Sequence, residues 1–385
     1  MTSLPTSTPS KRVVGSTKYH SSDDNPSRPP SNQTQELLKI AVGKELDGHT
    51  WQFAATTFAK MLSPKIRKTP LKLHHIDRLE DYKIVTIPIN MKALNSTKLL
   101  SIPFPESTSE RDHYLPLCDF LNNCVAVGHQ SLDQPKGKYY DDLKFIVWDC
   151  EVKDGIAGAA ALKPDLVGGK GLQEKDTTKA TGLYWRPPNP INHQLQIPVE
   201  VKGGWAELVR QAGTYARCLF HASPLRQHAI VLGYSHTDST LRFLIFHRGG
   251  LTSSVALNPS SQEDQLDILR IFLAMLAWET PAHAGLPMWC NDSEMFLPGV
   301  TGSVEVDKVL YNTLSIRGRA PRVLLIRKPN SSINALVPSP ETTCFGGPRR
   351  SKRLKATTTG AFITTVLMSV LTFHSRYIPF SPSVC

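Results

Sequence analysis

The stretch Pro198-Val199-Glu200-Val201-Lys202 alternates apolar and charged residues in the manner of a β-strand. Successive side chains of a strand point to opposite faces, so Glu200 and Lys202 share one face while Val199 and Val201 pack behind them. Upstream, Lys163-Pro164-Asp165-Leu166-Val167 places an acid beside a second apolar segment. If the two segments pair as strands, the carboxylates of Asp165 and Glu200 converge on one point of a sheet.

Two converging carboxylates beside a lysine suit metal-dependent hydrolysis of a phosphodiester. Mg²⁺ prefers a few carboxylate oxygens together with water and phosphate oxygens, which makes Asp165 and Glu200 the candidate metal ligands. The ion lowers the pKa of a bound water and neutralises charge in the transition state. Lys202 then orients the water or counters the developing charge.

The following segment, Gln211-Ala212-Gly213-Thr214-Tyr215, adds two polar groups at helical spacing. Gln211 and Tyr215 are four apart, so on a helix they share one face and are expected to reach back to the substrate or to Lys202. They complete the candidate catalytic set of Asp165, Glu200, Lys202, Gln211 and Tyr215. A further acidic group would come from Glu110 or Asp149, and the sequence leaves this choice open.

Each part of this pattern also has an ordinary structural explanation. A Glu-x-Lys pair is common on exposed strands, where it is a solvated ion pair that contributes little to stability. A Pro-Asp pair is common in turns. Only the joint occurrence of these groups, in this order and on apolar segments, favours a catalytic site, and it predicts the fold more directly than it predicts activity.

Composition points to an intracellular, nuclear or cytoplasmic protein. The chain has 385 residues and a formal charge of +11, which fits a nucleic-acid partner, although part of the excess lies in the basic run 348–355. Its seven cysteines form no C-x-x-C pair and are expected to be reduced thiols. Residues 1–36 lack the apolar run of a secretory signal. The apolar stretch 361–373 is shorter than the roughly 20 residues of a membrane span, so no membrane partner is expected.

Periodicity and composition divide the chain into five regions. We expect a disordered arm at 1–36, a helical cap at 37–106, a core at 107–280, a junction at 281–330 and a basic and apolar tail of low order at 331–385. The expected helical segments cover 35–63, the stretch from an N-cap at 107–110 to about 125, 205–220 and 265–278. The expected strands lie over 143–149, around Asp165, around Glu200, over 228–234 and over 241–247, with a loop insertion at 168–196. This order predicts an α/β (α+β) fold, a mixed sheet flanked by helices.

Asp165, the Glu200-x-Lys202 pair and the Gln211–Tyr215 pair match the PD-(D/E)xK pattern residue by residue, and the element order resembles its restriction-endonuclease-like core. The segments 110–121, 163–168, 198–216 and 241–250 resemble the N-terminal region of the fungal-type protein kinase family. Ile316-Arg317-Gly318-Arg319-Ala320-Pro321-Arg322-Val323 is similar to the junction at which the kinase domain of that family begins. The resemblance spans roughly Glu110 to Lys328 and implies a nuclease-like domain beside a kinase.

The kinase itself is missing from this sequence. A protein kinase needs a His-Arg-Asp catalytic loop and an Asp-Phe-Gly metal ligand, whereas His247-Arg248 is followed by Gly249 and no Asp-Phe-Gly occurs. We therefore expect a truncated gene product that is not a competent kinase. Two functions remain: a Mg²⁺-dependent nuclease-like enzyme, or a non-catalytic module that binds nucleic acid or protein and regulates a kinase.

Overall fold

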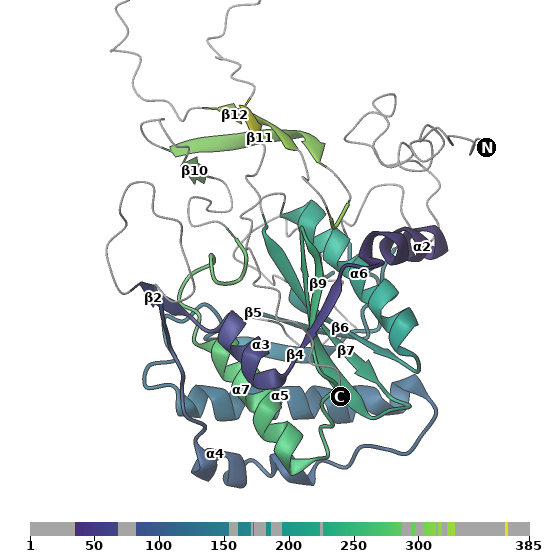
Figure 1. The fold of residues 1–385 in the computed structure, drawn as a ribbon, viewed down its shortest axis with the longest axis vertical. Coiled ribbons are helices and arrows are strands. Elements are labelled where there is room, and N and C mark those ends of the chain that lie inside the picture. The colour runs from purple at the N-terminus through teal and green to yellow at the C-terminus, as the bar shows by residue number, and fades with distance from the viewer. Residues whose placement is uncertain are drawn as a thin grey trace, which may run out of the picture.

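A seven-stranded mixed sheet forms the centre of the molecule (Figure 1). The computed structural model describes residues 35–67, 82–153, 161–170, 172, 182–185, 195–223, 226–286, 294–296, 303–312, 315–317, 322–327 and 366–368. The sheet order is β1-β9-β8-β7-β6-β5-β4. Its strands are β1 (Thr50–Phe53), β4 (Leu143–Val147), β5 (Leu166–Lys170), β6 (Leu195–Lys202), β7 (His228–Ser235), β8 (Thr240–His247) and β9 (Gly250–Ser254).

The strand directions follow from the connections between them. Strands β4, β5 and β6 form an antiparallel meander, and so do β7, β8 and β9. The two meanders meet at β6 and β7, which are parallel because helix α6 (Trp205–Ala222) crosses over between them. Strand β1 adds a further parallel pair at β9. The predicted mixed sheet is therefore confirmed.

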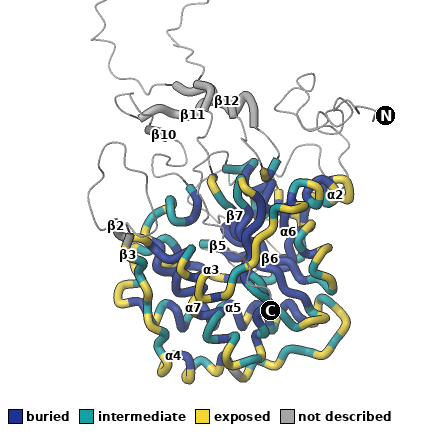
Figure 2. The backbone as a smooth tube through the Cα atoms, viewed as in Figure 1, coloured by how far each residue is buried: buried dark blue, intermediate teal, exposed yellow. Residues whose placement is uncertain are grey.

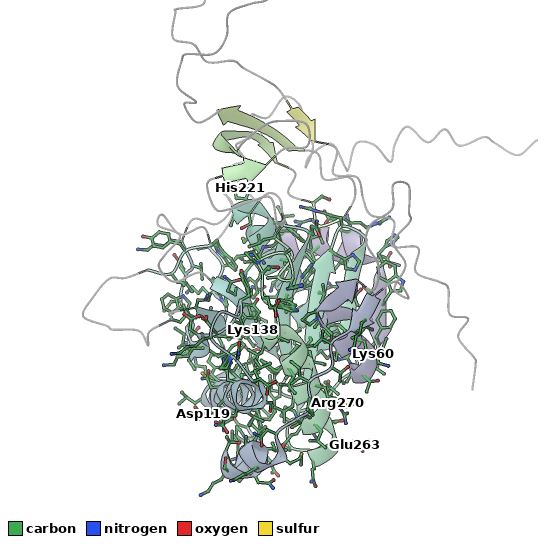
Figure 3. The ribbon with its side chains drawn as sticks, turned by 90° about the vertical axis from the view of Figure 1, so that its left-hand side faces the viewer. Lys60, Asp119, Lys138, His221, Glu263 and Arg270 are labelled. Carbon is green, nitrogen blue, oxygen red and sulfur yellow. The ribbon has the colours of Figure 1, made fainter. Side chains whose placement is uncertain are left out.

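Helices cover both faces of this sheet. On one face, α3 (Ala55–Leu62), α5 (Tyr114–Ser131) and α7 (Gln262–Leu276) share a core with Phe145, Val199 and Phe243 of the strands. On the other face, α2 (Gln35–Leu46) and α6 pack over Val167 and Val231. Figure 2 shows the buried strands between these layers. Side chains fill the space between helices and sheet, and charged residues such as Asp119 and Lys60 lie on the outside (Figure 3).

Shorter elements complete the described part. They are α4 (Met91–Ser96), the 3-10 helices η3 (Leu99–Ser101) and η4 (Glu110–His113), the antiparallel pair β2 (Lys65–Arg67) and β3 (Tyr82–Ile84), and an antiparallel sheet of β10 (Glu294–Phe296), β11 (Ser303–Asn312), β12 (Arg322–Arg327) and β13 (Val366–Met368). The cysteines at 118, 124 and 218 are buried. No helix among the described residues is long and apolar enough to cross a membrane.

Three sequence expectations need correction. The segment Thr50–Phe53 is a strand, not part of a helical run, because its β-forming residues find an edge partner in β9. Strand β9 itself was not predicted. The insertion is also shorter than 168–196, since β5 continues to Lys170 and β6 begins at Leu195.

Packing explains why Gly168 lies in a strand and not in the predicted loop. A Cβ at Gly168 would lie 2.5 Å from Cε1 of Phe145 on the neighbouring strand, so glycine lets that ring pack against the backbone. The α5 helix likewise extends past Val125 to Ser131. Residues 1–34 and the basic run 349–355 lie outside the described residues, while Gln35 and Glu36 form the start of α2.

Candidate functional site

Strand register brings Asp165 and Glu200 together. Strands β5 and β6 pair antiparallel with Leu166 opposite Val199, so the next position sets Asp165 opposite Glu200. Directly opposed residues lie on the same face of a sheet. Both side chains are buried, at 5% and 2% relative exposure. The backbone N–H of Val201 donates to Oδ2 of Asp165 at 2.7 Å, which fixes the carboxylate against the end of β6.

Asp165 receives a second hydrogen bond from the start of α5. The hydroxyl of Tyr114 donates to its Oδ1 at 2.5 Å. Burial raises the pKa of Asp165, and the hydrogen bonds from Tyr114 and Val201 oppose this shift without cancelling it. Burial also raises the pKa of Tyr114, with a further contribution from Asp165, so the hydroxyl keeps its proton. The carboxylate of Asp165 is therefore shielded from water and accepts a hydrogen bond from a tyrosine that stays protonated.

Glu200 lies between a tyrosine and a lysine. Tyr215 donates its hydroxyl proton to Oε2 at 2.5 Å, and Nζ of Lys202 lies 3.2 Å from Oε1. Burial raises the pKa of Glu200 to about 8, and the negative charge of Asp165 adds to the shift. The attraction of Lys202 opposes it. The negative charge of Asp165 thus acts on Glu200, and a cation placed between the two carboxylates would offset it.

Lys202 joins Glu200 to a third acid. Its Nζ donates to Oε2 of Glu110 at 2.8 Å. Burial lowers the pKa of Lys202, but the charge of Glu200 and the hydrogen bond to Glu110 outweigh it, so the pKa is raised and the ammonium stays charged. Asp149 instead pairs with the exposed Arg111 at 3.1 Å. Of the two acids that the sequence left open, Glu110 is the one that contacts the candidate site.

Gln211 and Tyr215 lie on the buried face of α6, at 3% and 0% exposure. Nε2 of Gln211 donates to the Tyr215 hydroxyl at 3.1 Å. Tyr215 of this pair contacts Glu200. Their neighbour in α2 is Gln35, whose Nε2 donates to Oε1 of Gln211 at 3.1 Å.

The donor set can be tested against a hard cation. Asp165 and Glu200 supply carboxylate oxygens, each of which has a spare lone pair beside its present hydrogen bond. Mg²⁺ commonly takes only one or two protein carboxylates and completes its octahedron with water and substrate phosphate. Among the described residues there is no group of three His, Cys, Asp or Glu side chains that could hold a metal. Carboxylate oxygens such as those of Asp165 and Glu200 are the donors that Mg²⁺ prefers.

Sequence reasoning missed two residues of this network, Tyr114 and Gln35. Tyr114 lies in the predicted helix that ends near 125 and follows Glu110 by four positions, a spacing that places two residues on one side of a helix. Nothing in the sequence near Gln35 indicates its contact with Gln211. That contact depends on the packing of α2 against α6.

Comparisons of the chain with protein-family models, with curated proteins and with solved structures found no match.

Proposed function

We propose that residues 107–280 form a PD-(D/E)xK nuclease-like domain that hydrolyses phosphodiester bonds of nucleic acid with Mg²⁺. The observation that carries the proposal is the buried pair Asp165 and Glu200, opposed on adjacent strands, with Lys202 bonded to Glu200 and Glu110. The element order α5-β4-β5-β6-α6-β7, with β6 and β7 parallel, supports a restriction-endonuclease-like core. The basic net charge supports a polyanionic substrate.

The roles of the side chains follow from their contacts. Asp165 and Glu200 would hold the ion, which supplies an activated water and neutralises charge on the phosphate. Lys202 keeps its proton and lies beside Glu200, where it orients the water or stabilises the developing negative charge. Tyr114 and Tyr215 fix the carboxylates. In the hydrolysis the water oxygen would bond to phosphorus and give up a proton to solvent, one P–O ester bond would break, and the leaving oxygen would take up a proton from solvent.

The proposed family is that of the fungal-type protein kinases, on the sequence segments that resemble its N-terminal region. The activity proposed does not include phosphoryl transfer, because the His-Arg-Asp and Asp-Phe-Gly elements are absent from the sequence.

One observation favours a second candidate, a non-catalytic module that binds nucleic acid or protein. All four carboxylate oxygens of Asp165 and Glu200 already have a partner within the protein. Because Lys202 already neutralises part of their charge, a metal ion must compete with it. A network satisfied in this way is sufficient to stabilise the fold without hydrolysis.

Cleavage assays with the full chain separate the two candidates. We expect cleavage of single-stranded DNA, double-stranded DNA or RNA with Mg²⁺ or Mn²⁺, loss with a chelator, and a loss of at least ~100-fold in Asp165→Asn and Lys202→Met, because metal binding and charge neutralisation depend on these groups. Asp119→Asn and Lys60→Met are matched controls on exposed helix surfaces and should cleave normally (Figure 3).

Two outcomes would contradict the nuclease proposal. Cleavage that survives in both site variants would show that the activity comes from elsewhere. Metal binding by calorimetry that is lost in Asp165→Asn, without cleavage of any nucleic acid, would favour the binding module.

A further inference from the structure

Helix α2 packs along α6, the helix that carries Gln211 and Tyr215 (Figure 1). The two helices approach closely at Gly213, where a Cβ would lie 2.3 Å from Cγ1 of Val42. Lys39 of α2 also pairs with Glu207 of α6 at 3.4 Å on the exposed side. The two helices are therefore in direct contact on their buried and on their exposed sides.

The start of α2 contacts the site through a chain of hydrogen bonds. Gln35 donates to Oε1 of Gln211, and this leaves the amide nitrogen of Gln211 to donate to the hydroxyl of Tyr215. Tyr215 has one proton and two acceptors within reach, Oε2 of Glu200 at 2.5 Å and the carbonyl of Lys163 at 3.0 Å. The donation from Gln211 occupies a lone pair of the hydroxyl and favours the orientation in which its proton points to Glu200.

The other end of α2 is held by a segment distant in sequence. Glu45 accepts hydrogen bonds from Arg217 at 2.7 Å, from the hydroxyl of Ser315 at 2.9 Å and from the N–H of Ile316 at 2.8 Å. Arg248 donates to the carbonyl of Ser315 at 2.6 Å, and the Ile316 side chain is fully buried. We name the contacts of Glu45 with Ser315 and Ile316 the clasp.

We propose that α2 is a positioning arm for the site: Gln35 orients Gln211 and thereby Tyr215, and the clasp holds the helix in place. The inference rests on the proposed function only where it treats Asp165 and Glu200 as a catalytic site. The contacts of α2 do not depend on that function. Gln35 is a positioning residue because it contacts Gln211 and neither carboxylate. Through the clasp, the position of the segment 315–317 affects α2 and thereby the hydrogen bond from Tyr215 to Glu200.

The test reads the hydroxyl proton of Tyr215 directly. A hydroxyl that donates at 2.5 Å gives a proton signal far downfield in nuclear magnetic resonance, and the signal is assigned by its loss in Tyr215→Phe. In Gln35→Ala this proton is no longer directed to Glu200, so the signal should move upfield or be lost by exchange with water. Lys39→Ala removes an α2 to α6 contact outside this series of hydrogen bonds and should leave the signal unchanged.

The clasp is tested with Ser315→Ala, which is milder than loss of the charged Glu45. We expect amide hydrogen exchange of α2 to accelerate by roughly tenfold, the factor that about 1.4 kcal/mol gives, together with a smaller upfield shift of the Tyr215 hydroxyl signal. An unchanged Tyr215 hydroxyl signal in Gln35→Ala, or unchanged α2 exchange in Ser315→Ala, would overturn the proposal. Neither measurement uses metal or nucleic acid, so absence of cleavage leaves this test unaffected.

Discussion

Replacing Glu200 by glutamine should stabilise the protein at alkaline pH while removing a candidate metal ligand. Burial and the charge of Asp165 raise the pKa of Glu200 from 4.5 to about 8. The folded state therefore keeps a proton that the unfolded chain releases at lower pH, so stability falls as pH rises through this window and is constant above it. At 1.36 kcal/mol per pH unit, and with partial relaxation of the buried charge, the cost is roughly 3–5 kcal/mol.

The Glu200→Gln variant keeps the shape and an acceptor for Tyr215, and Lys202 retains Glu110 as its partner. Urea unfolding at pH 5, 7 and 9 should show a free energy of unfolding close to that of the wild type at pH 5. The variant should be more stable by roughly 3 kcal/mol at pH 9.

Glu151 is exposed, so the Glu151→Gln variant serves as the control. Its free energy of unfolding should equal that of the wild type at every pH. A difference between Glu200→Gln and the wild type that stays constant, or that shrinks as pH rises, would refute a raised pKa at Glu200. It would also remove the argument that the carboxylate pair attracts a cation.

Two further substitutions test the packing around the site. Tyr114→Phe removes the hydroxyl that donates to Asp165 at 2.5 Å, so we expect the free energy of unfolding at pH 8 to fall by roughly 2 kcal/mol in urea titrations; wild-type stability would show that the hydrogen bond is not formed. Gly213→Ala places a Cβ 2.3 Å from Val42 and should cost roughly 1–3 kcal/mol by the same assay. Combination with Val42→Ala should recover part of this loss, and strictly additive losses would argue against close packing of α2 on α6.

The sequence determined the relations that depend on local geometry. Alternation along β6 sets Glu200 and Lys202 on one face, and helical spacing in α6 sets Gln211 beside Tyr215; the structure shows contacts within each pair. The strands β4, β7 and β8 and the helices α6 and α7 were predicted near their observed bounds for the same reason, whereas β5 continues into the predicted loop and α5 extends past its predicted end. The period of the apolar residues is a property of a few neighbouring residues and can be read without the fold.

Only the tertiary structure decided the relations between distant segments. Whether Asp165 faces Glu200 depends on the register of β5 on β6, and a slip of one residue would turn it to the other face. Glu110, and not Asp149, contacts Lys202 because η4 lies beside β6 in the folded chain. The strand Thr50–Phe53 exists because an edge of the sheet was available to it. These contacts join segments far apart in the chain, so no local pattern encodes them.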